Sequence, residues 1–143
     1  MDSSPHIEQI RLELALRIRH KAMYPDQNPE VVELSDDEEG IHFGLFDHNQ
    51  LISVASWFRR SDKEAQFRKF ATLEQFRNLG YGAQLMKYIV DFSKTEGIEI
   101  LWCNARIDAL NFYKRLGFRE TGTPFNKNGI DFIIIQLELH QTS

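Results

Sequence analysis

The chain has 143 residues, of which 42% are hydrophobic and 27% charged, as expected of one globular domain with a substantial core. With a net charge of −4, the chain lacks the broad positive field of a nucleic-acid-binding protein, so we expect no nucleic-acid partner. The single cysteine, Cys103, excludes an internal disulfide and fits a reducing compartment. No apolar stretch is long enough to span a bilayer, and residues 1–5 lack the basic flank and apolar run of a signal peptide. We therefore expect a cytoplasmic protein that forms one domain, residues 1–143, without a membrane partner.

The first half of the sequence predicts a strand, a helix and an antiparallel meander. Residues 6–10 alternate polar and apolar side chains, whereas residues 11–24 carry an apolar stripe at helical spacing that ends at Pro25. An irregular connection then leads to three strand-like segments separated by turn residues. The predicted elements are strand 6–10, helix 11–24, a helical turn at 29–32, and strands 41–46, 51–58 and 65–73.

The charged residues of this half are interpreted as solvated surface. Four basic residues fall in the predicted helix, and residues 35–39 form an acidic run. Such runs are most often exposed loop, although an acidic loop can also meet a cationic acceptor. The basic residues are Arg11, Arg17, Arg19 and Lys21.

The second half predicts a helix, a parallel strand, a short helix and a final pair of strands. After Gly82, Leu85, Ile89 and Phe92 form one face of a helix that ends at Gly97. The apolar run that follows should lie parallel to strand 65–73 through a right-handed crossover. The remaining elements are strand 98–103, helix 107–116, and strands 118–121 and 131–139, with a loop at 122–129. This order predicts an α/β fold with a mixed sheet of about seven strands flanked by helices.

The stretch between strand 65–73 and the next helix has the chemistry of an anion site. The sequence RNLGYG, residues 77–82, leads directly into the helix. The first amides of a helix have no intrahelical partner, and the helix dipole adds positive potential there. Because Gly80 and Gly82 have no Cβ, a bulky diphosphate can approach their backbone closely.

This stretch resembles the Q/R-x-x-G-x-G/A motif of the GNAT superfamily of N-acetyltransferases. A second segment, LWCNARIDALNFYKRLGF at residues 101–118, is similar to the family's later signature through Ala109, Tyr113, Gly117 and Phe118. The two signatures come in the family's order, separated by a helix and a strand. Within the superfamily, the phrases LRIRHK, RKFAT and CNAR look most like the small ElaA/YjcF-like branch.

The resemblance implies that acetyl-CoA lies between the splayed parallel strands 65–73 and 98–103, with its pyrophosphate on the amides of residues 77–82. The Arg77 side chain would also touch a phosphate. Family members often have an asparagine where this chain has Arg106, so Asn104 or Arg106 itself is expected at the cofactor. The residues implied in cofactor binding are Phe70, Ala71, Thr72, Arg77, Asn78, Leu79, Gly80, Tyr81, Gly82, Asn104, Arg106 and Phe112.

Tyr113 matches the tyrosine that family members place near the thioester sulfur. The resemblance therefore implies that its phenol, a proton donor at neutral pH, protonates the departing CoA thiolate. The competing interpretation is a packing aromatic on a short helix. Glu64 and Asp47 are candidates for the base that accepts the amine proton, and a backbone N–H at a bulge near Ala71 for stabilising the oxyanion.

Three further side chains complete the chemical possibilities. Arg68 and Lys69 should point to opposite faces of their strand, so that one of them lies at the acceptor side and favours acidic amines. Cys103 lies inside an apolar run and is expected to be a buried structural thiol, not a nucleophile. The five histidines show no metal-ligand spacing, so we expect no metal.

The sequence therefore predicts an N-acetyltransferase that moves the acetyl group of acetyl-CoA to an amine of a small molecule or peptide by direct transfer in a ternary complex. Three alternatives stay open: transfer of another acyl group or to a non-amine acceptor, an acyl-CoA-binding sensor with little turnover, and an interaction domain that binds no nucleotide. A homodimer is plausible for such a fold, although no residue demonstrates one.

Overall fold

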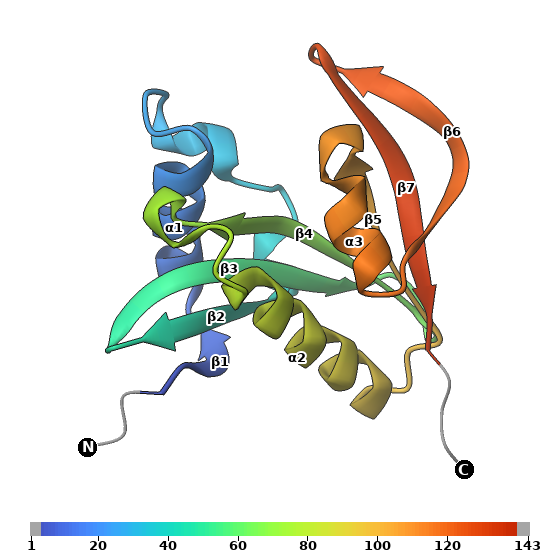
Figure 1. The fold of residues 1–143 in the computed structure, drawn as a ribbon, viewed down its shortest axis with the longest axis horizontal. Helices are drawn as coiled ribbons and strands as arrows, with labels where there is room; N and C mark the ends of the chain where they lie inside the picture. The colour runs from blue at the N-terminus through green and yellow to red at the C-terminus, as the bar shows by residue number, and fades with distance from the viewer. Residues whose placement is uncertain (1–3, 140–143) are drawn as a thin grey trace. The chain divides into compact units, whose positions relative to one another are not determined.

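The computed structural model describes residues 4–139, and its seven strands form one mixed sheet in the order β1-β2-β3-β4-β5-β7-β6 (Figure 1). The pair β4–β5 is parallel, as predicted. The α/β fold class expected from the sequence is thereby confirmed. The elements are β1 (His6–Ile10), α1 (Leu12–Met23), β2 (Ile41–Asp47), β3 (Gln50–Arg59), β4 (Glu64–Thr72), α2 (Tyr81–Thr95), β5 (Ile100–Arg106), α3 (Leu110–Arg115), β6 (Arg119–Lys127) and β7 (Ile130–Glu138), with short 3₁₀ turns between some of them.

The chain forms two compact units. The first contains Met1–Phe58 and Arg68–Ile89, and the second contains Arg59–Phe67 and Val90–Ser143. The boundaries fall inside β4 and inside α2, so each of these two elements contributes residues to both units. That the whole chain acts as a single domain stays a prediction.

In the first unit, β1 and β2 and likewise β2 and β3 pair antiparallel. The two-residue turn between β2 and β3 consists of His48 (φ 50) and Asn49 (φ 63). Two left-handed residues are what a type I′ turn needs, and that turn matches the twist of the strands it joins. The buried apolar residues of this unit include Ala15, Ile18, Val32, Phe43, Leu45, Ile52, Val54, Phe58, Leu85 and Ile89.

In the second unit, β5 is paired along both edges. The parallel ladder with β4 ends at Gln66 and Trp102. The antiparallel ladder with β7 continues to Arg106, opposite Phe132. The buried apolar residues of this unit include Ala65, Phe67, Ile98, Leu101, Cys103, Ala105, Tyr113, Phe118, Ile133 and Ile135.

The last two strands form a longer hairpin than the sequence predicted (Figure 1). Residues 122–127 belong to β6, so the loop expected at 122–129 is reduced to the two-residue turn Asn128–Gly129. The prediction failed because Gly122 and Pro124 signal a loop, whereas β7 continues as a partner strand and Phe125 stacks on Phe132 with ring centroids 5.8 Å apart. The register of the ladder shifts between Thr121 and Phe125.

The predicted helix 107–116 is a 3₁₀ turn, Ile107–Ala109, followed by α3. Gly117 ends it in a left-handed conformation (φ +98), and a Cβ there would lie 3.3 Å from Leu137 Cδ1. Glycine at this position is thus favoured both by the backbone and by the neighbouring side chain.

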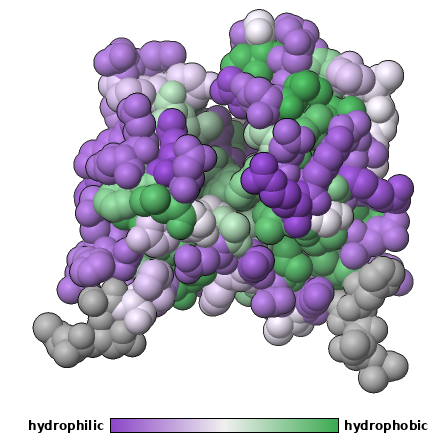
Figure 2. All heavy atoms as spheres, viewed as in Figure 1, coloured by the Kyte–Doolittle hydropathy of each residue, from purple (hydrophilic) through white to green (hydrophobic). Residues whose placement is uncertain are grey.

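The viewed surface is largely hydrophilic, with apolar side chains between the polar ones (Figure 2). In the second unit, the exposed large apolar residues include Ile107, Phe125 and Ile134. No helix within residues 4–139 combines the length and the apolar character needed to cross a membrane.

Candidate active site

The loop before α2, in the first unit, has the backbone shape of an anion site. Asn78 (φ 62) and Gly80 (φ 89) adopt left-handed conformations. Apart from Gly80 and its chain neighbours, no atom of residues 4–139 lies within 4 Å of the position where a Gly80 Cβ would stand, so a ligand can approach this backbone. Helix α2 begins at Tyr81, and the amides of residues 78–82 donate no backbone hydrogen bond to any other described residue. The predicted group of free amides is therefore present over residues 78–82.

Arg77 is occupied with the protein itself. Its amide donates to the Glu74 carbonyl at 3.2 Å. Its guanidinium donates from Nε to the Thr72 carbonyl at 3.0 Å and from Nη2 to the Ala22 carbonyl at 2.8 Å. The Arg77 side chain therefore links the end of α1 to the end of β4, and its contact with a phosphate stays a prediction.

The end of β4, where pantetheine is expected, is fixed to β3. The Ser53 hydroxyl lies 3.2 Å from the Ala71 carbonyl and 2.9 Å from the Thr72 Oγ1. Ala71 is buried, whereas Phe70 and Thr72 are half-buried. The backbone of residues 70–72 is thus fixed by hydrogen bonds with Ser53 and leads directly into the loop.

One residue within β4 has a left-handed backbone. Lys69 has φ 54, a conformation that occurs at some bulges, and it lies two residues before Ala71, near which a bulge was predicted. Arg68 and Lys69 are both half-buried. Their expected placement on opposite faces rested on regular strand alternation, and that basis is removed by the left-handed residue.

Asp47, one of the two candidate bases, is already engaged. Tyr81 donates its phenol hydrogen to Asp47 Oδ2, and His48 Nδ1 lies 3.1 Å from Asp47 Oδ1. The hydrogen bond with Asp47 raises the pKa of Tyr81. These contacts join the β2–β3 turn to the start of α2, and a role of Asp47 as the base stays a prediction.

Tyr113 lies on α3 in the second unit and is 8% exposed. Its ring centroid is 5.8 Å from those of Phe67 and Phe118 and 5.1 Å from that of Phe112. Burial, with a smaller contribution from Cys103, raises the pKa of Tyr113. The phenol therefore keeps its proton at neutral pH, which a donor requires. Its aromatic surroundings also fit a packing role, so catalysis by Tyr113 stays a prediction.

The other candidates of the second unit are more open. Asn104 and Arg106 are exposed near the end of β5, and Arg106 Nη2 lies 3.2 Å from Asp108 Oδ2. Phe112 is half-buried beside Tyr113, and Glu64 is exposed at the first residue of β4.

Cys103 is buried, as predicted, and burial raises the pKa of its thiol. A protonated thiol is a poor nucleophile, so Cys103 is a structural residue. Within the described part of the chain, no group of three or more His, Cys, Asp or Glu side chains is arranged to hold a metal ion.

The sequence placed Arg19 and Asp37 on the solvated surface, and both placements are wrong. Arg19 is completely buried, and Asp37 is 4% exposed. Arg19 Nη1 and Nη2 bind the two carboxylate oxygens of Asp37 at 2.9 and 2.8 Å, and Nη2 also donates to Ser56 Oγ at 2.8 Å. Helical spacing could have predicted the burial of Arg19, because this residue lies one turn after the buried Ala15 and so falls on the buried stripe of α1.

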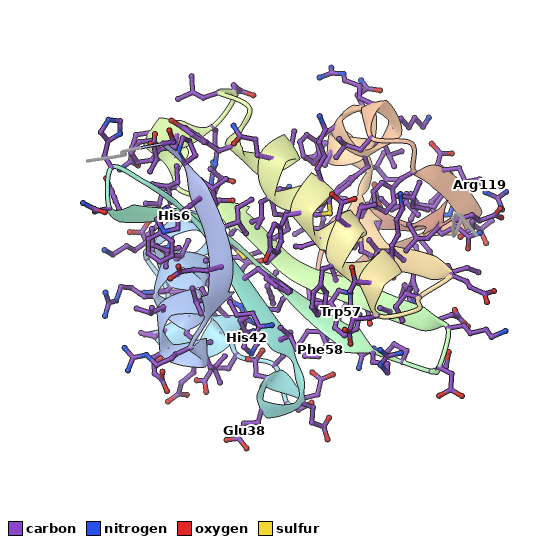
Figure 3. All side chains as sticks on the ribbon, turned by 90° about the horizontal axis from the view of Figure 1, so that it is seen from below. His6, Glu38, His42, Trp57, Phe58 and Arg119 are labelled. Carbon is purple, nitrogen blue, oxygen red and sulfur yellow. The ribbon has the colours of Figure 1, made fainter. Side chains whose placement is uncertain are left out.

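His42 completes this buried cluster. Its Nε2 lies 2.9 Å from the Asp37 carbonyl, and its Nδ1 lies 2.7 Å from Ser56 Oγ. A carbonyl only accepts, so Nε2 carries the hydrogen and Nδ1 accepts from the Ser56 hydroxyl. Burial lowers the pKa of His42, which is therefore neutral at pH 7. Figure 3 shows His42 beside Phe58, whose ring meets it edge-on with centroids 6.4 Å apart.

Comparisons with known proteins cover nearly the whole chain. The family model described as "Acetyltransferase (GNAT) domain" matches residues 12–139. A protein of Bacillus subtilis (strain 168), "Uncharacterized N-acetyltransferase YitI", is 33% identical over 145 residues, which cover 96% of this chain and 97% of that protein.

Two solved structures have the same fold. A GNAT family acetyltransferase from Elizabethkingia anophelis with acetyl-CoA bound gives a TM-score of 0.78 at 20% identity, over 96% of this chain and 100% of that chain. Escherichia coli ElaA gives a TM-score of 0.80 at 16% identity, over 94% of this chain and 100% of that chain.

Proposed function

This chain belongs to the GNAT acetyltransferase family, as its two signatures predicted, and we propose that it transfers the acetyl group of acetyl-CoA to an amine of a small molecule or peptide in a ternary complex. The observation that carries the proposal is the loop before α2. Asn78 and Gly80 turn the backbone so that successive amides precede a 15-residue helix. A diphosphate is the part of acetyl-CoA that suits such amides.

Pantetheine is assigned to the segment that leads into this loop. In coenzyme A the pantetheine arm follows the diphosphate, so a carrier held at residues 78–82 can extend its arm along the end of β4. The backbone of Phe70, Ala71 and Thr72 would then pair with the arm's amides. The hydrogen bonds that Ser53 makes with the Ala71 carbonyl and the Thr72 hydroxyl keep this segment in place before the ligand arrives.

The acetyl transfer is a single displacement at the thioester carbonyl. The amine nitrogen forms a bond to the carbonyl carbon, the C–S bond breaks, and the proton of the attacking amine passes to water. Tyr113 donates a hydrogen bond or a proton to the departing thiolate. The phenol is protonated at neutral pH, as a hydrogen-bond donor to the thiolate must be, and its raised pKa favours donation of a hydrogen bond over full transfer of the proton.

The loop is tested by Gly80→Ala with Gly97→Ala as its matched control. Both glycines have a positive φ, of +89 and +77, and open space at the Cβ position, so both variants lose roughly 1 kcal/mol of unfolding free energy. We expect acetyl-CoA to bind at least about tenfold more weakly only to Gly80→Ala, since the change there disturbs the phosphate-binding backbone. Equal affinities of the two variants, measured by calorimetry, would contradict the loop assignment.

The catalytic step is tested by Tyr113→Phe with Tyr88→Phe as control. Tyr88 is a more exposed tyrosine on α2. An amine screen over polyamines, amino acids, aminosugars, antibiotics and peptide N-termini first identifies an acceptor through acetyl-CoA consumption. We then expect kcat of Tyr113→Phe to fall by about 100-fold while its acetyl-CoA Kd changes less than about twofold. An unchanged kcat would leave Tyr113 as a packing residue.

The remaining alternatives give different results in the same assays. A sensor would show a higher Tm with acetyl-CoA but no consumption with any acceptor, because a ligand bound by the native state alone stabilises it. Turnover with another acyl-CoA, but not with acetyl-CoA, would identify a different acyl donor and leave the transferase assignment in place. An unchanged Tm with every acyl-CoA would leave an interaction domain.

A further inference from the structure

A cavity of about 340 Å³ lies in the first unit, lined by α1 and by the hairpin of β2 and β3. This volume is at the lower end of the range for small-molecule sites. Its apolar lining includes Leu14, Phe46, Leu51 and Leu73. The cavity is thus large enough for a compact ligand with an apolar body.

Two cations line the same cavity. Arg17 and Lys21 both contribute to its wall, and as residues four apart on α1 they lie on one face of the helix. Their side chains are exposed, and within residues 4–139 neither makes a hydrogen bond or an ion pair. Two uncompensated positive charges at the edge of an apolar cavity suit an anionic head group.

The cavity is separate from the acetyl-CoA loop but shares its supports. Arg77 holds the loop to α1 through the Ala22 carbonyl. Tyr81 holds it to the β2–β3 turn through Asp47. Leu73, a cavity residue, directly follows β4. None of residues 77–82 lines the cavity, so its occupant need not displace the diphosphate.

We propose that this cavity binds a small amphipathic carboxylate, with the carboxylate held by Arg17 and Lys21 and an alkyl or aryl body against Leu14, Phe46, Leu51 and Leu73. A planar guanidinium binds a carboxylate through two parallel hydrogen bonds, and the neighbouring ammonium adds charge. The ligand is a molecule other than acetyl-CoA, so this site does not depend on the proposed transfer reaction.

Calorimetric titration of the full chain with octanoate tests the proposal. Acetate has the head without the body and is expected to bind at least about tenfold more weakly than octanoate, whereas octanamide has the body without the charge and is expected to bind about fivefold more weakly. The double variant Arg17→Gln/Lys21→Gln is expected to weaken octanoate binding about fivefold, since each exposed charge pair contributes only modestly. The matched control is Arg11→Gln/Lys87→Gln, which removes two charges from exposed positions outside the cavity lining.

Four results would overturn the proposal. They are no octanoate binding to the natural chain, equal binding of acetate or octanamide, equal loss in the two double variants, and competitive displacement of octanoate by acetyl-CoA. The last would make the cavity part of the acetyl-CoA site. Octanoate binding that survives saturation with acetyl-CoA, or that occurs where acetyl-CoA does not bind at all, supports the cavity independently of the transferase proposal.

Discussion

Arg17 and Arg19 stand two residues apart on α1 and have opposite environments. Arg19 is completely buried and bound to Asp37, Ser56 and the Val32 carbonyl. Arg17 is exposed at the edge of a cavity, and its side chain makes no hydrogen bond or ion pair with the rest of the described chain. At about 100° per residue, two positions separate the side chains by roughly 200° around the helix.

The comparison shows that residue type alone did not decide these environments. A buried guanidinium is tolerated where several acceptors surround it, and its removal would leave those acceptors unpaired. An exposed guanidinium loses little when it is replaced. The same side chain therefore supports the fold on one side of α1 and is available for a ligand on the other.

The largest expected effect comes from the buried side. Arg19→Met leaves the Asp37 carboxylate buried without its cation, so we expect the unfolding free energy to fall by about 3–5 kcal/mol in urea titrations. The double variant Arg19→Met/Asp37→Leu removes both charges and should lose less than Arg19→Met alone. A double variant as unstable as the sum of its single changes would contradict this account of the pair.

An intermediate effect is expected for Arg77, whose exposed guanidinium binds two carbonyls. Arg77→Gln should lower the unfolding free energy by about 1 kcal/mol, less than a buried charged pair because solvent replaces part of the interaction. It should also weaken acetyl-CoA binding, since the loop loses its link to α1. Loss of stability with unchanged acetyl-CoA affinity would show that this link does not position the loop.

The buried cluster is expected to make stability depend on pH. Burial lowers the pKa of His42 below its ordinary 6.5, so its contribution to stability is complete above pH 6.5. As the pH falls from 6.5 through the lowered pKa of the folded state, the unfolded chain binds a proton that the folded chain resists, and stability is lost.

Asp37 acts in a separate pH range. Although burial opposes the shift, hydrogen bonds from Arg19 and from the Leu34 amide hold the pKa of Asp37 below its usual 3.8. Urea unfolding between pH 7.5 and 4.5 therefore separates the effect of His42 from that of Asp37. In His42→Gln, we expect a flatter dependence of the unfolding free energy on pH than in the natural chain; equal slopes would exclude His42 as the cause.

The smallest effect is expected on the open side of α1. Arg17→Gln and Lys21→Gln should each change the unfolding free energy by less than about 0.5 kcal/mol. The measurement is the same urea titration used for Arg19→Met. A loss comparable to that of Arg19 would mean that the two sides of the helix are not different after all.

The sequence predicted the fold and the loop because both depend on local patterns. Strand alternation, the apolar stripe of α2 and the glycines of RNLGYG act within a few residues of one another. The left-handed conformation of Lys69 was not predictable from such a pattern, since lysine has no preference for it. The two signatures named Tyr113, but burial of its ring beside Phe67 depends on the packed structure.

The buried cluster depends on partners that are distant in sequence. Arg19 binds Asp37 and Ser56, which are 18 and 37 positions away in the sequence. No local pattern therefore predicts that one carboxylate of the acidic run is buried. The prediction of where β6 ends failed for a related reason. Glycine and proline signal a loop locally, whereas pairing with β7 before Gly122 and after Pro124 keeps the segment in the hairpin.

Pro124 in β6 has a consequence for how molecules of this protein meet one another. β6 is the last strand in the sheet order, and proline has no N–H with which to continue a ladder. A neighbouring molecule that tried to extend the sheet there would encounter a missing donor and the shifted register between Thr121 and Phe125. At high concentration, growth of fibrils by strand addition at β6 is therefore disfavoured.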